Sequence, residues 1–250
     1  MTKKTKQITA RLELNIGDTP CEFEISVPMG KTGAEAALPF ARELTNKIVE
    51  VAAHDAQRNG ERIACSKGCG ACCAQLVPVS ETEARLLGRY VQSQPDSRRT
   101  TLLERFHQAK AKLEQAEMWQ DLIHPQPLSV EDSRALALRY FALNIPCPFL
   151  EDGACSIHPQ RPLTCREFLV TSDARHCSNP NPQDVKTVSI PKRVSNAFAR
   201  LYENDPHYVS NWVPLITAPY WTASHPAQPS QRKGPEWIEA LLAKVQNDAE

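Results

Sequence analysis

Hydrophobic and polar residues alternate near the start of the chain, in a pattern typical of two short strands. Residues 7–16 (QITARLELNI) and 21–28 (CEFEISVP) both have a period of two, and the turn-forming residues 17–20 (GDTP) separate them. A period of two places successive side chains on opposite faces of a strand. The pattern therefore predicts an N-terminal β-hairpin.

A helical period replaces this alternation over 34–58. Apolar residues recur there three and four positions apart, and the pair Asn59-Gly60 ends the pattern. Similar spacing predicts helices over about 81–94, 97–118, 130–144, 192–203 and 234–246. Ser80 is the predicted N-cap of the first of these, and Glu83 lies in its first turn, where the helix dipole favours negative charge.

Two longer regions follow neither period. Residues 145–181 contain five prolines and four cysteines, and a loop of this length is uncommon unless something such as a metal holds it. The stretch 204–233 is rich in Pro, Trp and Tyr and is predicted to be a packed loop arm, while a short strand is expected at 187–190. We therefore predict a mainly α fold with a small N-terminal β-hairpin and a long irregular cysteine-rich metal-binding loop region.

The chain of 250 residues is long enough for one large domain or a domain with an appendage. We predict three parts: a hairpin and helix over 1–60, a cysteine-cluster metal-binding domain over 61–181 with a helical insertion over 79–144, and a helical, aromatic extension over 182–250 that packs on the core. The aromatic side chains toward the C-terminus are predicted to be core, with the lining of a pocket as the alternative. They are Tyr202, Tyr208, Trp212, Tyr220, Trp221 and Trp237.

The charges of the chain balance, with 29 Lys and Arg against 29 Asp and Glu, so no overall field indicates a nucleic-acid partner. No apolar run approaches the ~20 residues that a membrane-spanning helix needs, and residues 1–30 lack the apolar stretch of a signal peptide. We therefore expect a cytoplasmic protein outside the membrane. Cytosolic thiols are kept reduced, so the nine cysteines indicate metal binding or redox chemistry rather than disulfides.

Eight of the nine cysteines fall in two short windows. Glycines separate the thiols of the first window, and small residues there let backbone N–H groups turn toward sulfur. Two CxxC pairs would complete a metal site within one window, but neither window contains such a set. We therefore expect the two windows to meet in space across the helices of 79–144. Thiolates select zinc, copper(I) or iron–sulfur clusters; the alternative is a set of buried apolar thiols. The predicted ligands are Cys65, Cys69, Cys72, Cys73, Cys147, Cys155, Cys165 and Cys177.

Neighbouring residues refine this ligand set. Cys72 and Cys73 are adjacent and do not easily serve one ion, so one of them is expected to bind a second metal or remain a free thiol. Cys21, in the predicted hairpin, is expected to be a plain core or surface residue. His176 is a further candidate beside Cys177. Cationic residues near the cysteines in sequence are expected to offset thiolate charge, with ordinary surface positions as the alternative; they are Lys67, Arg161, Arg166 and Arg175.

The full motif reads Cys65-x3-Cys69-Gly-x-Cys72-Cys73, Cys147-Pro-Phe-Leu, Cys155-Ser-Ile-His158, Arg161-Pro-x2-Cys165-Arg166-x-Phe168 and Cys177. This combination, over about 61–180, resembles the YkgJ-type cysteine-cluster family, also called CxxCxxCC, of iron–sulfur or zinc-chelating proteins. The resemblance implies that all eight cysteines have family counterparts. The first spacing has one extra residue, and His158 stands where a tyrosine is common, which adds an imidazole near the site or only changes the packing.

Three functions are compatible with such a centre. The first is a redox or accessory module that holds an iron–sulfur cluster, with Zn²⁺ as the alternative, and serves a protein partner. The second is an enzyme that uses the cluster for methyl transfer or radical chemistry; its local acid–base candidates are Glu167, Asp173 and His176, all expected to be exposed. The third is a structural zinc site that only holds the irregular loop.

A competing motif begins at the first window. Cys65-x3-Cys69-x2-Cys72 has the spacing of radical S-adenosylmethionine enzymes, which bind a [4Fe–4S] cluster. Ala71 stands where those enzymes usually have an aromatic residue. The chain also lacks the repeated strand–helix alternation of a βα barrel, so this alternative is disfavoured.

Overall fold

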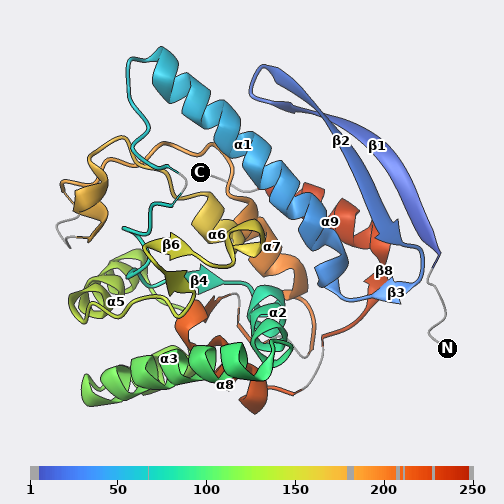
Figure 1. Ribbon diagram of the computed structural model, residues 1–250. Helices are drawn as coiled ribbons and strands as arrows, with labels where there is room; N and C mark the ends of the chain where they lie inside the picture. The colour runs from blue at the N-terminus through green and yellow to red at the C-terminus, as the bar shows by residue number, and fades with distance from the viewer. Residues whose placement is uncertain are drawn as a thin grey trace.

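The computed structural model of the chain describes residues 6–66, 68–178, 183–206, 209–210, 212–226 and 229–247. Within these ranges helices predominate, and the strands form small antiparallel pairs (Figure 1). The mainly α fold with an N-terminal hairpin is therefore confirmed. No helix in the described ranges is both long and apolar enough to cross a membrane.

The predicted hairpin pairs β1 (Gln7–Ile16) with β2 (Thr19–Pro28), with Ile16 opposite Thr19. The second strand begins two residues earlier than expected, so the turn is shorter than the predicted 17–20. Gly17 occupies that turn with a φ of 57°, a left-handed conformation that glycine adopts without steric cost. Alternate residues of β2, from Cys21 to Val27, are buried, whereas β1 is largely exposed. The hairpin therefore covers the core mainly with one face of β2, to which β1 adds Ile16.

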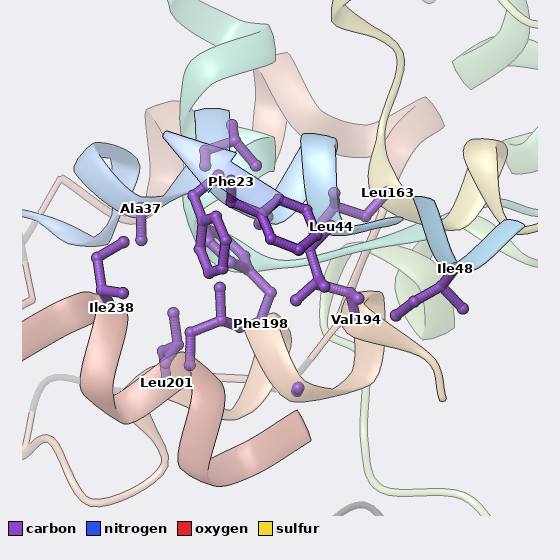
Figure 2. Close-up of a cluster of buried hydrophobic side chains, with 14 of the residues drawn as sticks. Phe23, Ala37, Leu44, Ile48, Leu163, Val194, Phe198, Leu201 and Ile238 are labelled. Atoms are coloured by element: carbon purple, nitrogen blue, oxygen red, sulfur yellow. The ribbon is translucent and has the colours of Figure 1, made fainter. Parts of the chain in front are cut away.

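A first apolar core lies under the hairpin, and we call it the hairpin core. Its helices are η1 (Ala34–Ala37), α1 (Leu38–Arg58), α7 (Val194–Ala199), η4 (Arg200–Tyr202) and α9 (Gly234–Gln246). Figure 2 shows Phe23, Leu44 and Phe198 among the side chains that meet there. N-terminal and C-terminal segments thus contribute to the same core. Trp237 of α9 is fully buried, and its indole N–H donates to the Thr32 carbonyl at 2.8 Å.

A second core, the insertion core, joins the helices of the middle of the chain to a C-terminal one. They are α2 (Glu81–Gln92), α3 (Asp96–Gln115), α4 (Trp119–Ile123), α5 (Val130–Ala142) and α8 (Ala218–Ser224). Phe106 and Phe149 meet edge to face, with ring centroids 5.7 Å apart. Trp221 of α8 is fully buried in the same core.

Short strand pairs and short helices complete the fold. The strand pairs are β3 (Lys31–Thr32) with β8 (Arg232–Lys233), β4 (Pro78–Val79) with β7 (Val213–Pro214), and β5 (Leu150–Glu151) with β6 (Ala154–Cys155). The short helices are η2 (His158–Gln160), α6 (Leu163–Arg166), η3 (Ala174–Ser178) and η5 (Leu215–Thr217). Most of the second cysteine window therefore consists of pieces of two to five residues.

The structure corrects two expectations about the C-terminal part. The strand expected at 187–190 is only a single bridge between Val170 and Thr187. The loop arm expected over 204–233 contains η5, α8 and two short strands. α8 was missed because it spans only seven residues, with a proline in its first turn, and seven residues are too few to establish a period of 3.6.

Candidate metal centre

The two cysteine windows lie against each other, as predicted. The Cys147 N–H donates to the Cys73 carbonyl at 2.6 Å, and the Ser178 hydroxyl donates to the Ala71 carbonyl at 3.2 Å. A third bond, from the Ala64 N–H to the Val170 carbonyl at 2.9 Å, lies just before Cys65. In Figure 1 the chain after α1 accordingly runs beside the segments that flank α6.

Gly70 is a point of close approach between the two windows. A Cβ atom on Gly70 would lie 2.5 Å from the Gly153 carbonyl oxygen and 2.6 Å from a methyl carbon of Leu150. Real Cβ atoms do not come so close, so only glycine fits without moving the β5–β6 turn. The glycines between the cysteines, expected from the sequence to free backbone donors, therefore also allow the windows to pack together.

The eight cysteines of the two windows form one electrostatic group around Cys72. The Cys72 thiol hydrogen-bonds with Cys73. Five further thiols interact electrostatically with Cys72 itself; they are Cys65, Cys147, Cys155, Cys165 and Cys177. The Cys69 thiol interacts with those of Cys65 and Cys177. Cys21 lies outside the group, buried in the hairpin core with its thiol on the Thr19 carbonyl at 3.7 Å. The assignment of Cys21 as a plain core residue is confirmed.

Burial and mutual repulsion keep most of these thiols neutral in the metal-free chain. Burial raises the pKa of Cys147 to about 12 and that of Cys177 to about 11. The pKa of Cys165 is also raised well above the ordinary thiol value by burial. Cys72 differs, because its hydrogen bond with Cys73 lowers its pKa to about 7 and raises that of Cys73. Several of these thiols can therefore be deprotonated together only when a positive charge lies beside them.

Arg161 is one cation that faces the thiols. Its guanidinium lowers the pKa values of Cys65, Cys72 and Cys155. Its buried Nε has no hydrogen-bond partner among the described residues. Arg161 is therefore close enough to interact with these thiols, and its role in offsetting the charge of metal-bound thiolates stays a prediction.

Arg166 has a different position. It is buried and donates to the Arg161 carbonyl at 3.1 Å, the Pro159 carbonyl at 2.6 Å and the Asn46 side-chain oxygen at 3.0 Å. Burial, followed by the neighbouring arginines, lowers the pKa of its guanidinium to about 10. Arg166 therefore ties the Arg161 loop to α1, in addition to its electrostatic interaction with Cys165.

Glu83 is a positioning residue that the sequence did not identify. It forms a capping box with Ser80 at the start of α2. Its other carboxylate oxygen accepts the Leu163 N–H at 2.9 Å, which fixes the start of α6 two residues before Cys165. The capping box was visible in the sequence, but the contact with α6 joins residues 80 positions apart.

The three acid–base candidates fall in different environments. Glu167, expected to be exposed, is buried at 2% and accepts the Ser195 N–H at 2.9 Å and the Ser195 hydroxyl; the expectation was wrong because α7 packs over it. Burial raises its pKa. Asp173 is exposed and paired with Arg175 at 2.8 Å, and His176 is half-buried. His158 is exposed, and Lys67 and Tyr208 lie outside the described residues.

No group of three or more His, Cys, Asp or Glu side chains in the described ranges is arranged to hold a metal ion. The identity of the individual ligands therefore stays a prediction. The donor set nevertheless fits a soft metal chemically, because eight sulfurs from two windows belong to one group and a guanidinium faces them. Of the aromatic residues, Trp221 and Trp237 are core, as predicted.

Residues 64–183 match the model of the CxxCxxCC family, whose description reads "Putative zinc- or iron-chelating domain". The segment contains all eight clustered cysteines, and it is this part of the chain that is similar to the family. The family resemblance seen in the sequence is thereby confirmed, and the description supports metal binding. No curated protein and no solved structure matches the chain.

Proposed function

We propose that the eight clustered cysteines hold an iron–sulfur cluster, and that the protein serves a partner protein in the cytoplasm as a redox or accessory module. The observation that carries this proposal is the gathering of thiols from both windows around Cys72. A single tetrahedral zinc uses four ligands. An iron–sulfur cluster also uses four cysteines, so eight thiols suit two sites, or one cluster with thiols to spare, better than one zinc ion.

In this proposal the chain's own residues supply the thiolates and their surroundings. Arg161 offsets thiolate charge, and Arg166 holds the loop that carries Arg161. Glu83 holds the start of α6 and thereby Cys165. An iron–sulfur cluster, when bound, supplies one-electron transfer whose potential depends on hydrogen bonds and charge around its sulfurs.

Zn²⁺ is the second candidate. The short elements of the second window favour it, because a structural zinc would hold such pieces together. An enzymatic role has weaker support from the described carboxylates. Glu167 and Asp173 are both engaged, one with Ser195 and the other with Arg175.

The test is the metal content of the full chain purified without oxygen. Iron, acid-labile sulfide and zinc are measured together with the visible spectrum. We expect iron with sulfide and broad visible absorption. Colourless protein with about one or two zinc ions per chain would overturn the iron–sulfur proposal, because the filled d shell of Zn²⁺ gives no colour, and would leave the zinc site in its place.

A further inference from the structure

The N-terminal hairpin leaves both of its long edges unpaired. β1 and β2 have ten residues each and form a sheet of two strands, with no third strand beside either of them within the described ranges. In Figure 1 β1 lies outermost, on the side of β2 away from α1. An exposed strand edge presents backbone N–H and C=O groups that can pair with another strand. The hairpin is therefore a candidate surface for the addition of a strand.

The register of the hairpin shows which backbone groups of β1 face outward. Ile16 lies opposite Thr19 across a turn of two residues, and such a turn is closed by a hydrogen-bonded pair. At the other end of the same ladder the Met29 N–H donates to the Lys6 carbonyl at 2.8 Å. Hydrogen-bonded pairs alternate along an antiparallel ladder, so the even-numbered residues of β1 bond to β2. The odd-numbered residues of β1 therefore direct their N–H and C=O groups to the free edge.

The free edge of β2 is poorly suited to pairing. By the same alternation its even-numbered residues face outward, and two of them, Pro20 and Pro28, have no N–H to donate. Glu22 and Glu24 lie between these prolines, so a second copy of this edge would bring like charges together. β1 has no proline and carries one cation and one anion. The difference favours β1 as the pairing edge.

The sequence of β1 is complementary to itself when two copies run antiparallel about Leu12. In this register Arg11 of each copy lies opposite Glu13 of the other. Both are odd-numbered, so their outward backbone groups meet as a hydrogen-bonded pair. A register centred on Arg11 or on Glu13 would place that residue opposite itself, and like charges directly opposite each other destabilise a sheet. The apolar residues match as well; the pairs are Leu12 with Leu12, Ala10 with Leu14, and Ile8 with Ile16.

Three side chains of β1 have environments that a second copy would improve. Ile8 is exposed at 40% and would be covered by the neighbouring strand. Glu13 lies opposite Glu22 within the hairpin, and this arrangement of like charges costs free energy. The Arg11 side chain is 88% exposed and its Nε reaches Glu24 only at 3.9 Å, so its guanidinium is open to a second carboxylate.

We propose that two copies of this protein associate through their β1 strands, which pair antiparallel about Leu12 to form one four-stranded sheet. The strand order is β2, β1, β1 and β2, and the two-fold axis passes through Leu12 perpendicular to the sheet. Each dimer then contains two contacts between Arg11 and Glu13. None of the eight clustered cysteines belongs to the hairpin. The proposal therefore goes beyond metal binding and is independent of which metal the cysteines hold.

The test begins with the mass of the full metal-bound chain in solution, measured by light scattering from about 1 μM to about 1 mM. We expect the mass to approach twice that of one chain as the concentration rises. Hydrogen exchange at the odd-numbered amides of β1 should slow over the same range, whereas exchange at Glu22 and Glu24 should not change. A chain that stays monomeric, including one whose β1 pairs only with a strand of another protein, would overturn the proposal.

Charge-reversal variants test the register. Arg11→Glu brings glutamates opposite each other and Glu13→Arg brings arginines opposite each other, so each variant alone should associate at least about 10-fold more weakly. Mixed in equal amounts, the two variants should form a heterodimer, because every glutamate then lies opposite an arginine. A mixture that stays monomeric would overturn the proposal, as would single variants that associate as well as the unaltered chain.

A matched pair of proline variants tests the edge. Thr9 and Ser26 lie opposite each other, and the Thr9 hydroxyl donates to the Ser26 hydroxyl oxygen at 3.2 Å. Thr9→Pro and Ser26→Pro both break this bond and both remove an outward N–H, but only Thr9 lies on the β1 edge. Thr9→Pro should weaken association at least about 10-fold, and Ser26→Pro should leave it unchanged. Equal effects of the two variants would overturn the proposal.

Circular dichroism and metal content of every variant separate this inference from the proposed function. The hairpin variants should keep both the fold and the metal while they lose association. The metal measurement on the unaltered chain, in turn, has no bearing on whether the β1 strands pair.

Discussion

The two apolar cores and the cysteine region are held together in different ways. The cores are built from long helices, such as α1 with 21 residues and α3 with 20, and from fully buried side chains such as Trp237 and Phe106. The described part of the second cysteine window has elements of five residues or fewer. Apolar burial therefore stabilises the two cores, whereas the cysteine region depends on backbone contacts, buried polar groups and, as we propose, a bound metal.

The contacts of the cysteine region support this division. Leu163 of α6 packs in the hairpin core, whereas Ile145, Phe149 and Ile157 pack in the insertion core, so both cores hold the second window. The two windows are also joined by backbone bonds such as that from Cys147 to Cys73. A single hydrogen bond contributes only ~1 kcal/mol. The region is therefore expected to be the part of the molecule that responds most to metal.

The largest effect is expected in the hairpin core. Trp237→Ala should lower the free energy of unfolding by about 3–5 kcal/mol, because it leaves a large cavity and removes the bond to the Thr32 carbonyl. Denaturant titration measures the change. The metal content of the folded fraction should stay the same. A proportional loss of metal would show that the core and the cysteine region are not separable.

The next effect should be confined to the cysteine region. Cys69→Ser and Cys165→Ser should each lose metal and reduce stability by about 2–3 kcal/mol, since serine is a poor ligand for soft metals. Hydrogen exchange should accelerate in 61–77 and 145–178 but not in α1 or α3.

Cys21→Ser is the control for these variants, because Cys21 lies in the hairpin core. It should leave metal content unchanged. Unaltered metal in Cys69→Ser or Cys165→Ser would remove that residue from the ligand set. Metal loss in Cys21→Ser would show that the ligand set is misplaced.

Gly70→Ala should have a smaller effect on stability, about 1–3 kcal/mol, because the new methyl group would collide with the Gly153 carbonyl. Thermal unfolding measures it, and metal content should fall as the windows separate. Ser66→Ala, at an exposed position of the same segment, is the control. A neutral Gly70→Ala would mean that the two windows are held less closely than the structure has them.

The smallest effect is expected from removing the positive charge of Arg161 beside the thiols. Arg161→Gln should weaken metal binding by about 10-fold and leave the cores intact, because Arg161 faces three of the cysteines. Competition with a chelator measures the affinity. Arg175→Gln, which removes an exposed guanidinium paired with Asp173, should leave it unchanged. Equal affinities in the two variants would contradict the assigned role of Arg161.

Local patterns were sufficient for the larger elements of the fold. The hairpin, α1, α2, α3, α5 and α9 all lie where periodicity placed them, to within a few residues. The short helices α4, α6 and α8 were missed, because four to seven residues cannot establish a helical period. The burial of Glu167 was missed for a different reason: a carboxylate is exposed by default, and only the packing of α7 supplies the Ser195 donors that satisfy it.

The presence of a cysteine-rich metal-binding motif could be predicted from the chain alone, because cysteine identity and spacing are local properties and both windows fall in the segment that matches the family. Tertiary packing selects the groups that surround that chemistry. It brings Arg161 into electrostatic contact with three of the thiols, ties the loop of Arg161 to α1 through Arg166, and uses Glu83 to hold the start of α6. Each of these depends on contacts between residues far apart in the chain, which no local pattern records because packing, not spacing, brings them together.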